Sequence, residues 1–217
     1  MPLRENLPST ASQAKIIGKK KLYSASAARN APFILEVLSQ YLPDKGKVLE
    51  IASGTGQHCT YFAKAFCNLE WQPSEINPKR LDSIQAYIKE TNQVNINMPL
   101  SLDATGENWA KEIDAYNVII VINFFHLISN KEMKTLIRES SLALQTNSYF
   151  VIYGPFMRGG ELTSDQDIKF HTSLFECDPD IGYKDDFDIL DEIEANNLSP
   201  EAIIEMPSNN LMFVAKK

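Results

Sequence analysis

Apolar residues along this chain fall into two recurring patterns, short unbroken runs and stripes with helical spacing. Short runs bounded by turn residues are typical of buried strands, and they occur at 47–52, 69–74, 99–102, 118–122 and 149–153. Between the runs, helical spacing recurs, for example in Leu81, Ile84 and Ile88. Strands joined by helices must run parallel with right-handed crossovers. The sequence therefore predicts an α/β fold with a mostly parallel sheet and helices on both faces.

Capping residues predict where three of the helices begin. Asn30 precedes Pro32, and Asn77 precedes Pro78, so each pair combines a capping side chain with a proline in the first helical turn. Residues 129–132 read Ser-Asn-Lys-Glu, which matches a capping box. We expect the first helix of the domain to begin at Asn30, behind a polar segment.

The last third of the chain predicts a loop excursion followed by a terminal hairpin. Residues 158–186 are polar and contain two adjacent glycines, as expected for a long loop over one end of the sheet. Helical spacing returns at 187–193, and apolar runs at 202–206 and 211–215 flank the turn at 207–210. A four-residue turn forces antiparallel pairing. The last strand is therefore expected to lie antiparallel within the sheet.

Composition and charge narrow the class of protein. The 217 residues are 44% hydrophobic and 23% charged, which fits one domain with a buried core. We expect a polar N-terminal arm over residues 1–22 and a single domain over residues 23–217. The net charge of −7 argues against a DNA partner, because nucleic-acid binding needs a basic surface. The lysines at positions 15 and 19–21 are expected to be solvated on the arm.

The sequence predicts no membrane, disulfide or metal partner. No apolar run approaches the length needed to span a bilayer, and the first residues lack a signal-peptide pattern, so we expect a cytoplasmic protein. Cys59, Cys67 and Cys177 form no Cys-x-x-Cys pair and are expected to be reduced, buried thiols. The three histidines are scattered, so a protein-bound metal is not expected. Nothing in the sequence indicates an oligomeric state.

The strand at 47–52 runs directly into the loop Gly54-Thr55-Gly56 and then into a helical pattern. Glycine serves where the chain turns at positive φ or where a ligand must approach the backbone, and the following helix offers free N–H groups. The same pattern also occurs as a plain tight turn in α/β proteins. The residues of this segment that we expect to contribute to a cofactor site are Glu50, Ala52, Ser53, Gly54 and Gly56.

Three further polar residues follow predicted strands, where open α/β sheets bind their ligands. Glu75 follows the second strand, Asp103 the third, and Asn123 the central apolar strand. A carboxylate after the second strand can accept both ribose hydroxyl protons, and one after the third can accept from the adenine amino group. Each of them could instead be a surface charge or a turn residue. Their joint order predicts an adenosine site.

The residues around the loop favour one adenosine cofactor over another. A dinucleotide fingerprint places a third glycine where this chain has Cys59, although cysteine is small enough not to exclude it. Glu50, just upstream, suits the cationic sulfonium and α-amino end of S-adenosylmethionine better than it suits a pyrophosphate. We therefore favour S-adenosylmethionine as the cofactor and keep an NAD-type oxidoreductase as the alternative.

Several stretches of the sequence resemble a known family. They are Arg29-Asn30, residues 48–58, Glu70-Trp71-Gln72-Pro73-Ser74, Asn123 with His126, Tyr153-Gly154-Pro155-Phe156, and Met206-Pro207 with Asn209-Asn210-Leu211. Through them, most of residues 23–217 resembles methyltransferase-like protein twenty-six and its bacterial relatives, a group catalogued as a domain of unknown function. The resemblance implies a Rossmann-like, seven-stranded methyltransferase sheet with an antiparallel last strand, and an S-adenosylmethionine-dependent methyltransferase activity.

Two segments depart from the pattern of that family. Residues 24–28 read Ser-Ala-Ser-Ala-Ala where the family usually reads Ser-Pro-Ala-Ala-Glu, and Ile181 stands where tryptophan is usual. Both departures lie in segments that we expect to face the substrate. The resemblance therefore supports the fold more strongly than it supports any substrate.

In-line transfer of a methyl group mainly requires an acceptor atom held near the methyl carbon. A base can assist where the acceptor is a hydroxyl, thiol or carboxyl group. His126, three residues past Asn123, is the first candidate for a catalytic residue, and Tyr153 is the second. The alternatives are structural: a histidine packed under the loop at 158–186, and a core tyrosine with a bonded hydroxyl.

Asn123 is followed by Phe124-Phe125-His126 and not by the Pro-Pro-aromatic run with which amino-directed nucleic-acid methyltransferases hold a base. Together with the acidic net charge, this predicts a small-molecule or other non-DNA acceptor. A second class of function also fits the sequence, a non-catalytic module that binds S-adenosylmethionine and presents a surface to another protein.

Overall fold

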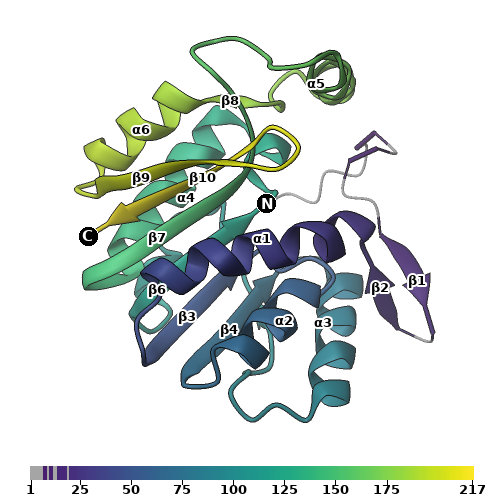
Figure 1. Ribbon diagram of the computed structural model, residues 1–217, viewed down its shortest axis with the longest axis vertical. Helices are drawn as coiled ribbons and strands as arrows, with labels where there is room; N and C mark the ends of the chain where they lie inside the picture. The colour runs from purple at the N-terminus through teal and green to yellow at the C-terminus, as the bar shows by residue number, and fades with distance from the viewer. Residues whose placement is uncertain (1–6, 9, 12–13, 19) are drawn as a thin grey trace.

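The computed structural model describes residues 7–8, 10–11, 14–18 and 20–217, and its centre is a mixed sheet of eight strands (Figure 1). Seven of them follow the spatial order β5-β4-β3-β6-β7-β10-β9, and the short β8 pairs with the end of β7. The strands are β3 (Gly46–Ile51), β4 (Leu69–Glu75), β5 (Leu100–Ser101), β6 (Tyr116–Ile122), β7 (Leu144–Met157), β8 (Lys184–Asp185), β9 (Ser199–Met206) and β10 (Asn210–Lys216).

The strand directions confirm the predicted topology. The strands from β5 to β7 pair in parallel, whereas β10 pairs antiparallel with both β7 and β9. The chain proceeds outward from β3 to β4 and β5, then returns to place β6 on the other side of β3. The strand order therefore reverses between β3 and β6, and ligands of open α/β sheets bind at the carboxyl ends of the strands beside such a reversal.

Two layers of helices cover the sheet, as expected. On one face lie α1 (Ala25–Tyr41), α2 (Gln57–Ala65) and α3 (Pro78–Thr91), and on the other lie α4 (Asn130–Ala143) and α6 (Asp186–Ala195). A further helix, α5 (Asp165–Cys177), stands apart from both layers (Figure 1). Two 3-10 turns, η1 (Trp109–Lys111) and η2 (Phe125–Leu127), connect the elements near β6.

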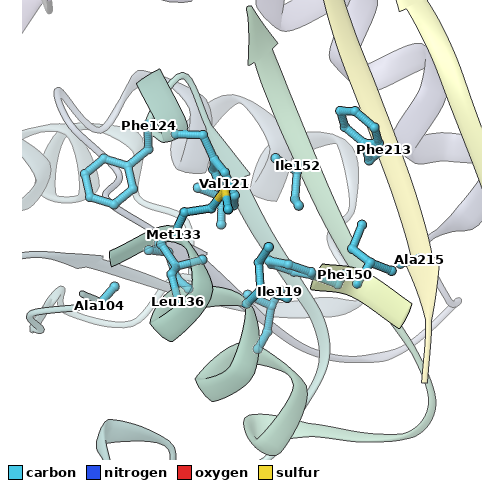
Figure 2. Close-up of a cluster of buried hydrophobic side chains, with 14 of the residues drawn as sticks. Ala104, Ile119, Val121, Phe124, Met133, Leu136, Phe150, Ile152, Phe213 and Ala215 are labelled. Carbon is cyan, nitrogen blue, oxygen red and sulfur yellow. The ribbon is translucent and has the colours of Figure 1, made fainter. Parts of the chain in front are cut away.

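The apolar run of β6 explains why this strand lies at the centre. Val118 and Ile120 point into the core under α1, α2 and α3, whereas Ile119 and Val121 point into the core under α4 and α6. Figure 2 shows the second of these cores, with Met133 of α4 against β6 and β7. Full burial of one such side chain contributes roughly 1.5–3 kcal/mol. A strand that is apolar at every position is therefore stable only between two layers.

The predicted capping signals at Asn77 and at Ser129 with Glu132 are correct. Asn77 accepts hydrogen bonds from the first turn of α3, and Ser129 and Glu132 form a complete capping box on α4. The prediction for the first helix is wrong. Helix α1 begins at Ala25, where the side chain of Ser24 accepts from the backbone N–H of Ala27, 3.3 Å away. Asn30 therefore lies inside the helix.

The N-terminal arm is partly ordered. Strands β1 (Lys15–Ile17) and β2 (Lys21–Tyr23) form an antiparallel hairpin that contacts α3. The backbone N–H of Leu22 donates to the Ser83 hydroxyl over 2.8 Å, and Lys20 pairs with Asp82 at 3.2 Å. Lys21 pairs with Glu90. Lys15 and Lys20 are exposed, as expected for solvated lysines, whereas Lys21 is partly buried, so the expectation is wrong for Lys21. Lys19 lies outside the described residues.

Two further expectations need correction. The region 158–186 is not one long loop, because it contains all of α5 and β8. Of the three cysteines, Cys59 is buried but Cys67 and Cys177 are exposed. In the part of the chain that the structure describes, no helix has the length and apolar character to cross a membrane.

Candidate functional site

A cavity of about 730 Å³ opens at the carboxyl ends of β3, β4, β6 and β7, beside the reversal of strand order. One half is formed by the glycine-rich loop after β3, the end of β4 and the start of α3. The other half is formed by α1, η2, α5 and the turn between β9 and β10. The volume lies within the range of roughly 300–1,000 Å³ that is usual for small-molecule sites. We call these the loop half and the helix half.

The loop half depends on unusual backbone angles. Ala52, Gly54 and Gly56 have positive φ values of 53°, 58° and 91°. A Cβ atom at Gly56 would lie 2.8 Å from the Cα of Ile84, so the loop can pack on α3 only with glycine there. Gly56 itself does not line the cavity, whereas Ala52 and Gly54 do. The second glycine therefore has a structural role, and the first lies at the cavity.

Ser53 ties the loop to the neighbouring strand. Its backbone N–H donates to the carbonyl oxygen of Ser74 over 2.8 Å, and its hydroxyl accepts from the N–H of Ser74 at 3.2 Å. The same hydroxyl donates to the carbonyl oxygen of Glu50 over 3.1 Å. The ends of β3 and β4 are thus joined through one small side chain, which also lines the cavity.

The buried Glu75 carboxylate holds the floor of the loop half. One oxygen accepts from the N–H of Gly54 at 3.1 Å, and the other accepts from Ile76 at 2.9 Å and Asn77 at 3.2 Å. The guanidinium of Arg80 lies 3.8 Å away. The carboxylate thus orients the glycine loop and faces the cavity, where acceptor capacity remains for hydroxyl groups of a ligand.

Glu50 is the most deeply buried acid of the cavity wall. Its side chain is 2% exposed, and its Oε2 atom has no hydrogen-bond partner. Burial raises the pKa of this carboxyl to about 8, and a hydrogen bond with Ser53 opposes the shift. The group is therefore protonated at neutral pH. A cation brought into the loop half would favour its ionised form.

Asn123 and Asp103 also belong to the predicted adenosine site, but only Asn123 is among the residues that line the cavity. Asn123, with a φ of 53°, lines the cavity and lies next to Gly154, and its N–H donates to the carbonyl oxygen of Tyr153 over 2.7 Å. Asp103 follows β5 as predicted but is not among the residues that line the cavity. Its carboxylate accepts from the N–H of Thr105 at 3.0 Å and from the hydroxyl at 2.7 Å, which is a turn geometry.

His126 lies in the helix half, as its position after β6 suggests. The side chain is 6% exposed, and its ring packs against Phe170 of α5 and against Tyr183, with centroid distances of 5.6 and 6.4 Å. Burial, together with the smaller effect of the Lys184 charge, lowers the pKa of the imidazole to about 3. His126 is therefore neutral at pH 7 and a weak proton acceptor, although it lines the cavity.

Tyr153 belongs to a buried polar chain that the sequence did not reveal. The hydroxyl hydrogen-bonds the side chain of Asn30, whose Oδ1 lies 2.8 Å from the Nε2 atom of His58. Burial raises the pKa of Tyr153 and lowers that of His58 to about 4. All three side chains line the cavity. The chain therefore connects α1 and α2 to the end of β7.

Gln57 connects the two halves of the site. Its amide oxygen accepts from the N–H of Ser24 at 2.6 Å and from the Thr55 hydroxyl at 3.0 Å. Its amide nitrogen donates to the carbonyl oxygen of Ser24 over 3.2 Å. The start of α1 is thus fixed to the glycine loop by one side chain. The sequence pattern gives no signal for this role of Gln57.

The cavity offers acids, amides and aromatic rings. Over the described part of the chain, no group of three or more His, Cys, Asp or Glu side chains is arranged to hold a metal ion. The loop half presents buried acids beside a glycine loop, which suits a cationic ligand with hydroxyl groups. The helix half presents rings and hydrogen-bond donors, which suits a small organic molecule.

Comparison with solved structures identifies the class of the fold. PigF with SAH superposes with a TM-score of 0.75 at 15% identity, over 88% of this chain and 56% of the other. An O-methyltransferase family protein from Burkholderia thailandensis gives 0.73 at 14% identity, over 88% and 57%. Human N-acetylserotonin methyltransferase in complex with SAM gives 0.73 at 8% identity, over 88% and 52%. The fold is that of the Rossmann-like methyltransferases.

The chain spans little more than half the length of these structures, and identities of 15% or less establish the fold alone. The family follows from the sequence comparison. Residues 21–217 match the family described as "Protein of unknown function (DUF938)". The protein therefore belongs to this family.

Proposed function

We propose that the protein is an S-adenosylmethionine-dependent methyltransferase that acts on a small-molecule or other non-DNA acceptor. The observation that carries the proposal is the composition of this cavity. Its loop half has buried acids around a glycine loop, and its helix half has aromatic walls. Asn123 lines the cavity between the end of β6 and η2. A cofactor in the loop half and an acceptor in the helix half would meet near this residue.

The loop half fits S-adenosylmethionine through its acids. Glu75 has remaining acceptor capacity for ribose hydroxyl groups, and Glu50 has an oxygen without a partner that a cationic group would stabilise in ionised form. Gly54 and Ala52 keep the loop backbone open toward the cavity. The carboxylate of Asp103 is bonded to Thr105, so it can bind the adenine amino group only if this turn rearranges. The proposal for Asp103 therefore depends on its position after β5 alone.

When bound, the cofactor supplies a methyl group on a sulfonium. The protein's task is then to hold an acceptor atom in line with that group and to exclude water. His126 and Tyr153 stay the candidate catalytic residues for an acceptor that must lose a proton. Both are buried, and each presents a hydrogen-bonding atom to the helix half.

The names of the structural neighbours agree with this proposal, because they include an O-methyltransferase family protein and PigF with SAH. We also propose that the protein is related to methyltransferase-like protein twenty-six, on the stretches that the two share. A cytoplasmic location remains a prediction from the sequence.

Calorimetric titration of the purified protein with S-adenosylmethionine, S-adenosylhomocysteine and NAD in parallel tests the cofactor. We expect micromolar binding of the first two and none of NAD. Binding of NAD alone would favour the oxidoreductase alternative, and binding of none of the three would reject the proposed function.

A second candidate function is a non-catalytic module that binds the cofactor. One observation favours it: the low pKa of His126 and the bonded hydroxyl of Tyr153 leave the cavity without a strong base. Incubation with S-adenosylmethionine labelled on the methyl group and a range of cell extracts separates the two functions. Transfer of label to any component identifies an enzyme, whereas binding without transfer across all extracts identifies a module.

A further inference from the structure

The helix half of the cavity contains a cation and no carboxylate. Arg29 lines this half from α1, and within the described chain no acidic side chain pairs with it. Among the described residues, the acids that line the cavity are Glu50 and Glu75, and both are in the loop half. In a protein with a net charge of −7, an arginine without an acidic partner at a ligand cavity is a candidate anion site.

Two tyrosine hydroxyls and the His58 ring in the helix half are bonded to the protein itself. The hydroxyl of Tyr183 donates to the Asp167 carboxylate over 2.9 Å, and that of Tyr153 is bonded to Asn30. His58 is bonded to Asn30 and to the backbone of Ala27. None of these groups is free to take a proton from an acceptor.

His126 adds a donor to the same half. Its Nδ1 atom is enclosed and has no hydrogen-bond partner, so only Nε2 can reach the cavity. We assign the proton to Nε2, because a buried N–H without a partner is rarer than a buried lone pair without one. In this tautomer His126 donates to a ligand and does not act as a base. Arg29 and His126 then both favour a negatively charged ligand.

Aromatic rings define the shape of that ligand. Phe33 is 47% exposed on the same helix as Arg29, and it lines the cavity with Phe170 and Tyr183. Exposed aromatic rings around a cavity provide flat apolar contact area. A planar molecule with one anionic group matches both the rings and the cation.

We propose that the methyl acceptor is a small planar carboxylic acid, which Arg29 binds as its carboxylate. This inference rests on the proposed function. One carboxylate oxygen forms a bond to the methyl carbon, the carbon–sulfur bond breaks, and its electron pair stays on sulfur. The products are a methyl ester and S-adenosylhomocysteine. No proton is transferred, so the reaction needs no base in the helix half.

Binding of defined probes tests the anion site. The protein saturated with S-adenosylhomocysteine is titrated with benzoate, cinnamate and hexanoate, and with the amide of each. We expect benzoate or cinnamate to bind at least tenfold more tightly than its amide. Arg29→Gln should remove this preference, whereas Lys169→Gln should change the affinities less than twofold. Lys169 is a matched control, because it is exposed on α5 next to Phe170 and does not line the cavity.

The chemical stability of the product is the second readout. Labelled methyl transferred to small molecules of a deproteinised extract should be released as methanol by mild alkali, as a methyl ester is. Label that resists alkali would overturn the proposal, and so would equal binding of acids and amides or an Arg29→Gln protein that binds benzoate normally. Failure to bind S-adenosylhomocysteine at all would instead reject the underlying methyltransferase function.

Discussion

Gly56 has a φ of 91° and no space for a side chain against Ile84, so its replacement should cost more than the backbone angle alone. We predict that Gly56→Ala lowers the free energy of unfolding by about 2–5 kcal/mol, from about 1–2 kcal/mol of left-handed strain and about 1–3 kcal/mol of overpacking. Urea unfolding measures the change. Gly160→Ala is the control, because Gly160 has a φ of 84° with nothing within 4 Å of the new methyl group. Equal losses would contradict the packing role.

Glu50 gives the empty protein a specific dependence on pH. Burial raises the pKa of this carboxyl from its ordinary value of 4.5 to about 8. The folded state therefore keeps a proton that the unfolded state loses, and stability falls as pH rises from 4.5 to 8. The pKa values of His58 and His126, lowered to about 4 and 3, and the lowered pKa of His171 act in the opposite direction until the unfolded state has lost its imidazole protons above pH 7.

We predict that the free energy of unfolding falls by about 1.5 kcal/mol between pH 6.5 and 8 relative to that of Glu50→Gln, a comparison in which the histidine contributions cancel. Glu50→Gln, which stays neutral, should show no such fall and should be the more stable protein at pH 8. Urea titrations at several pH values measure both proteins. Parallel pH profiles for the two would show that Glu50 ionises normally.

Glu75 holds the glycine loop and also faces the cavity, and one substitution tests both roles. Its carboxylate accepts three backbone N–H groups as well as facing the cavity. Glu75→Gln keeps one oxygen acceptor but turns an NH2 group toward an N–H donor. We predict a loss of about 1–3 kcal/mol in stability and at least a tenfold loss in S-adenosylmethionine affinity. Calorimetry at a temperature where the variant stays folded measures the affinity, and an unchanged value would contradict the ribose site.

At the scale of elements, the sequence predicted the strands of the sheet and the helices that pack on it, but it missed α5, which does not pack on the sheet. The runs at 118–122 and 202–206 and the cap at Asn77 are correct, because burial between layers leaves a periodic pattern. Helix α5 buries only Asp167 and Leu174, so it has no apolar stripe. Its one signal is Ser164 followed by two acidic residues in the first turn.

The start of α1 was missed for a related reason. Asn30 and Pro32 look like a cap and a first turn, but Ser24 is the true cap and Pro32 lies inside the helix. The position of this helix is set by Gln57, more than thirty residues away in the sequence, through two bonds to Ser24. Local propensity contains no information about such a contact.

The same distinction applies to the site. The positions of Glu50, Gly54, Glu75 and Asn123 at the cavity were predictable, because each lies at or just after the carboxyl end of a strand. Arg29, Asn30 and His58 come from helices, where the residue that faces a cavity depends on how the helix packs. Asp103 shows that a position after a strand does not by itself place a residue at the cavity, since such a residue can also form a turn.

The clamp between α1 and the glycine loop can be tested through Gln57. Gln57→Ala removes its bonds to Ser24 and Thr55, each worth about 1 kcal/mol net. We predict faster hydrogen exchange at residues 24–30 and a several-fold weaker affinity for S-adenosylmethionine. Gln40→Ala is the control, because Gln40 bonds only to Glu36 on the same helix. Unchanged exchange in Gln57→Ala would show that α1 holds its position without the clamp.

At the scale of the whole molecule, the cavity is closed by a segment that precedes the domain core. Thr10 and Ala14 line the helix half, and Ala11 packs in a small buried cluster with Leu127, Leu174 and Ile181. This cluster is separate from the two cores on either side of the sheet. Described residues of the N-terminal segment therefore line the helix half of the cavity, whereas the loop half is built at the edge of the sheet.

Removal of residues 1–14 should consequently affect the two halves differently. We predict that affinity for S-adenosylmethionine stays within threefold of the full chain, because the groups of the loop half begin at Glu50. Uncovering Leu127, Leu174 and Ile181 exposes an apolar surface, so binding of a hydrophobic fluorescent dye should rise several-fold. Substitution Ala11→Asp in the full chain should reproduce the rise in dye binding, since a buried unpaired carboxylate expels the segment. A truncated protein that binds the dye no better than the full chain would mean that the cluster is closed by α5 and η2 alone.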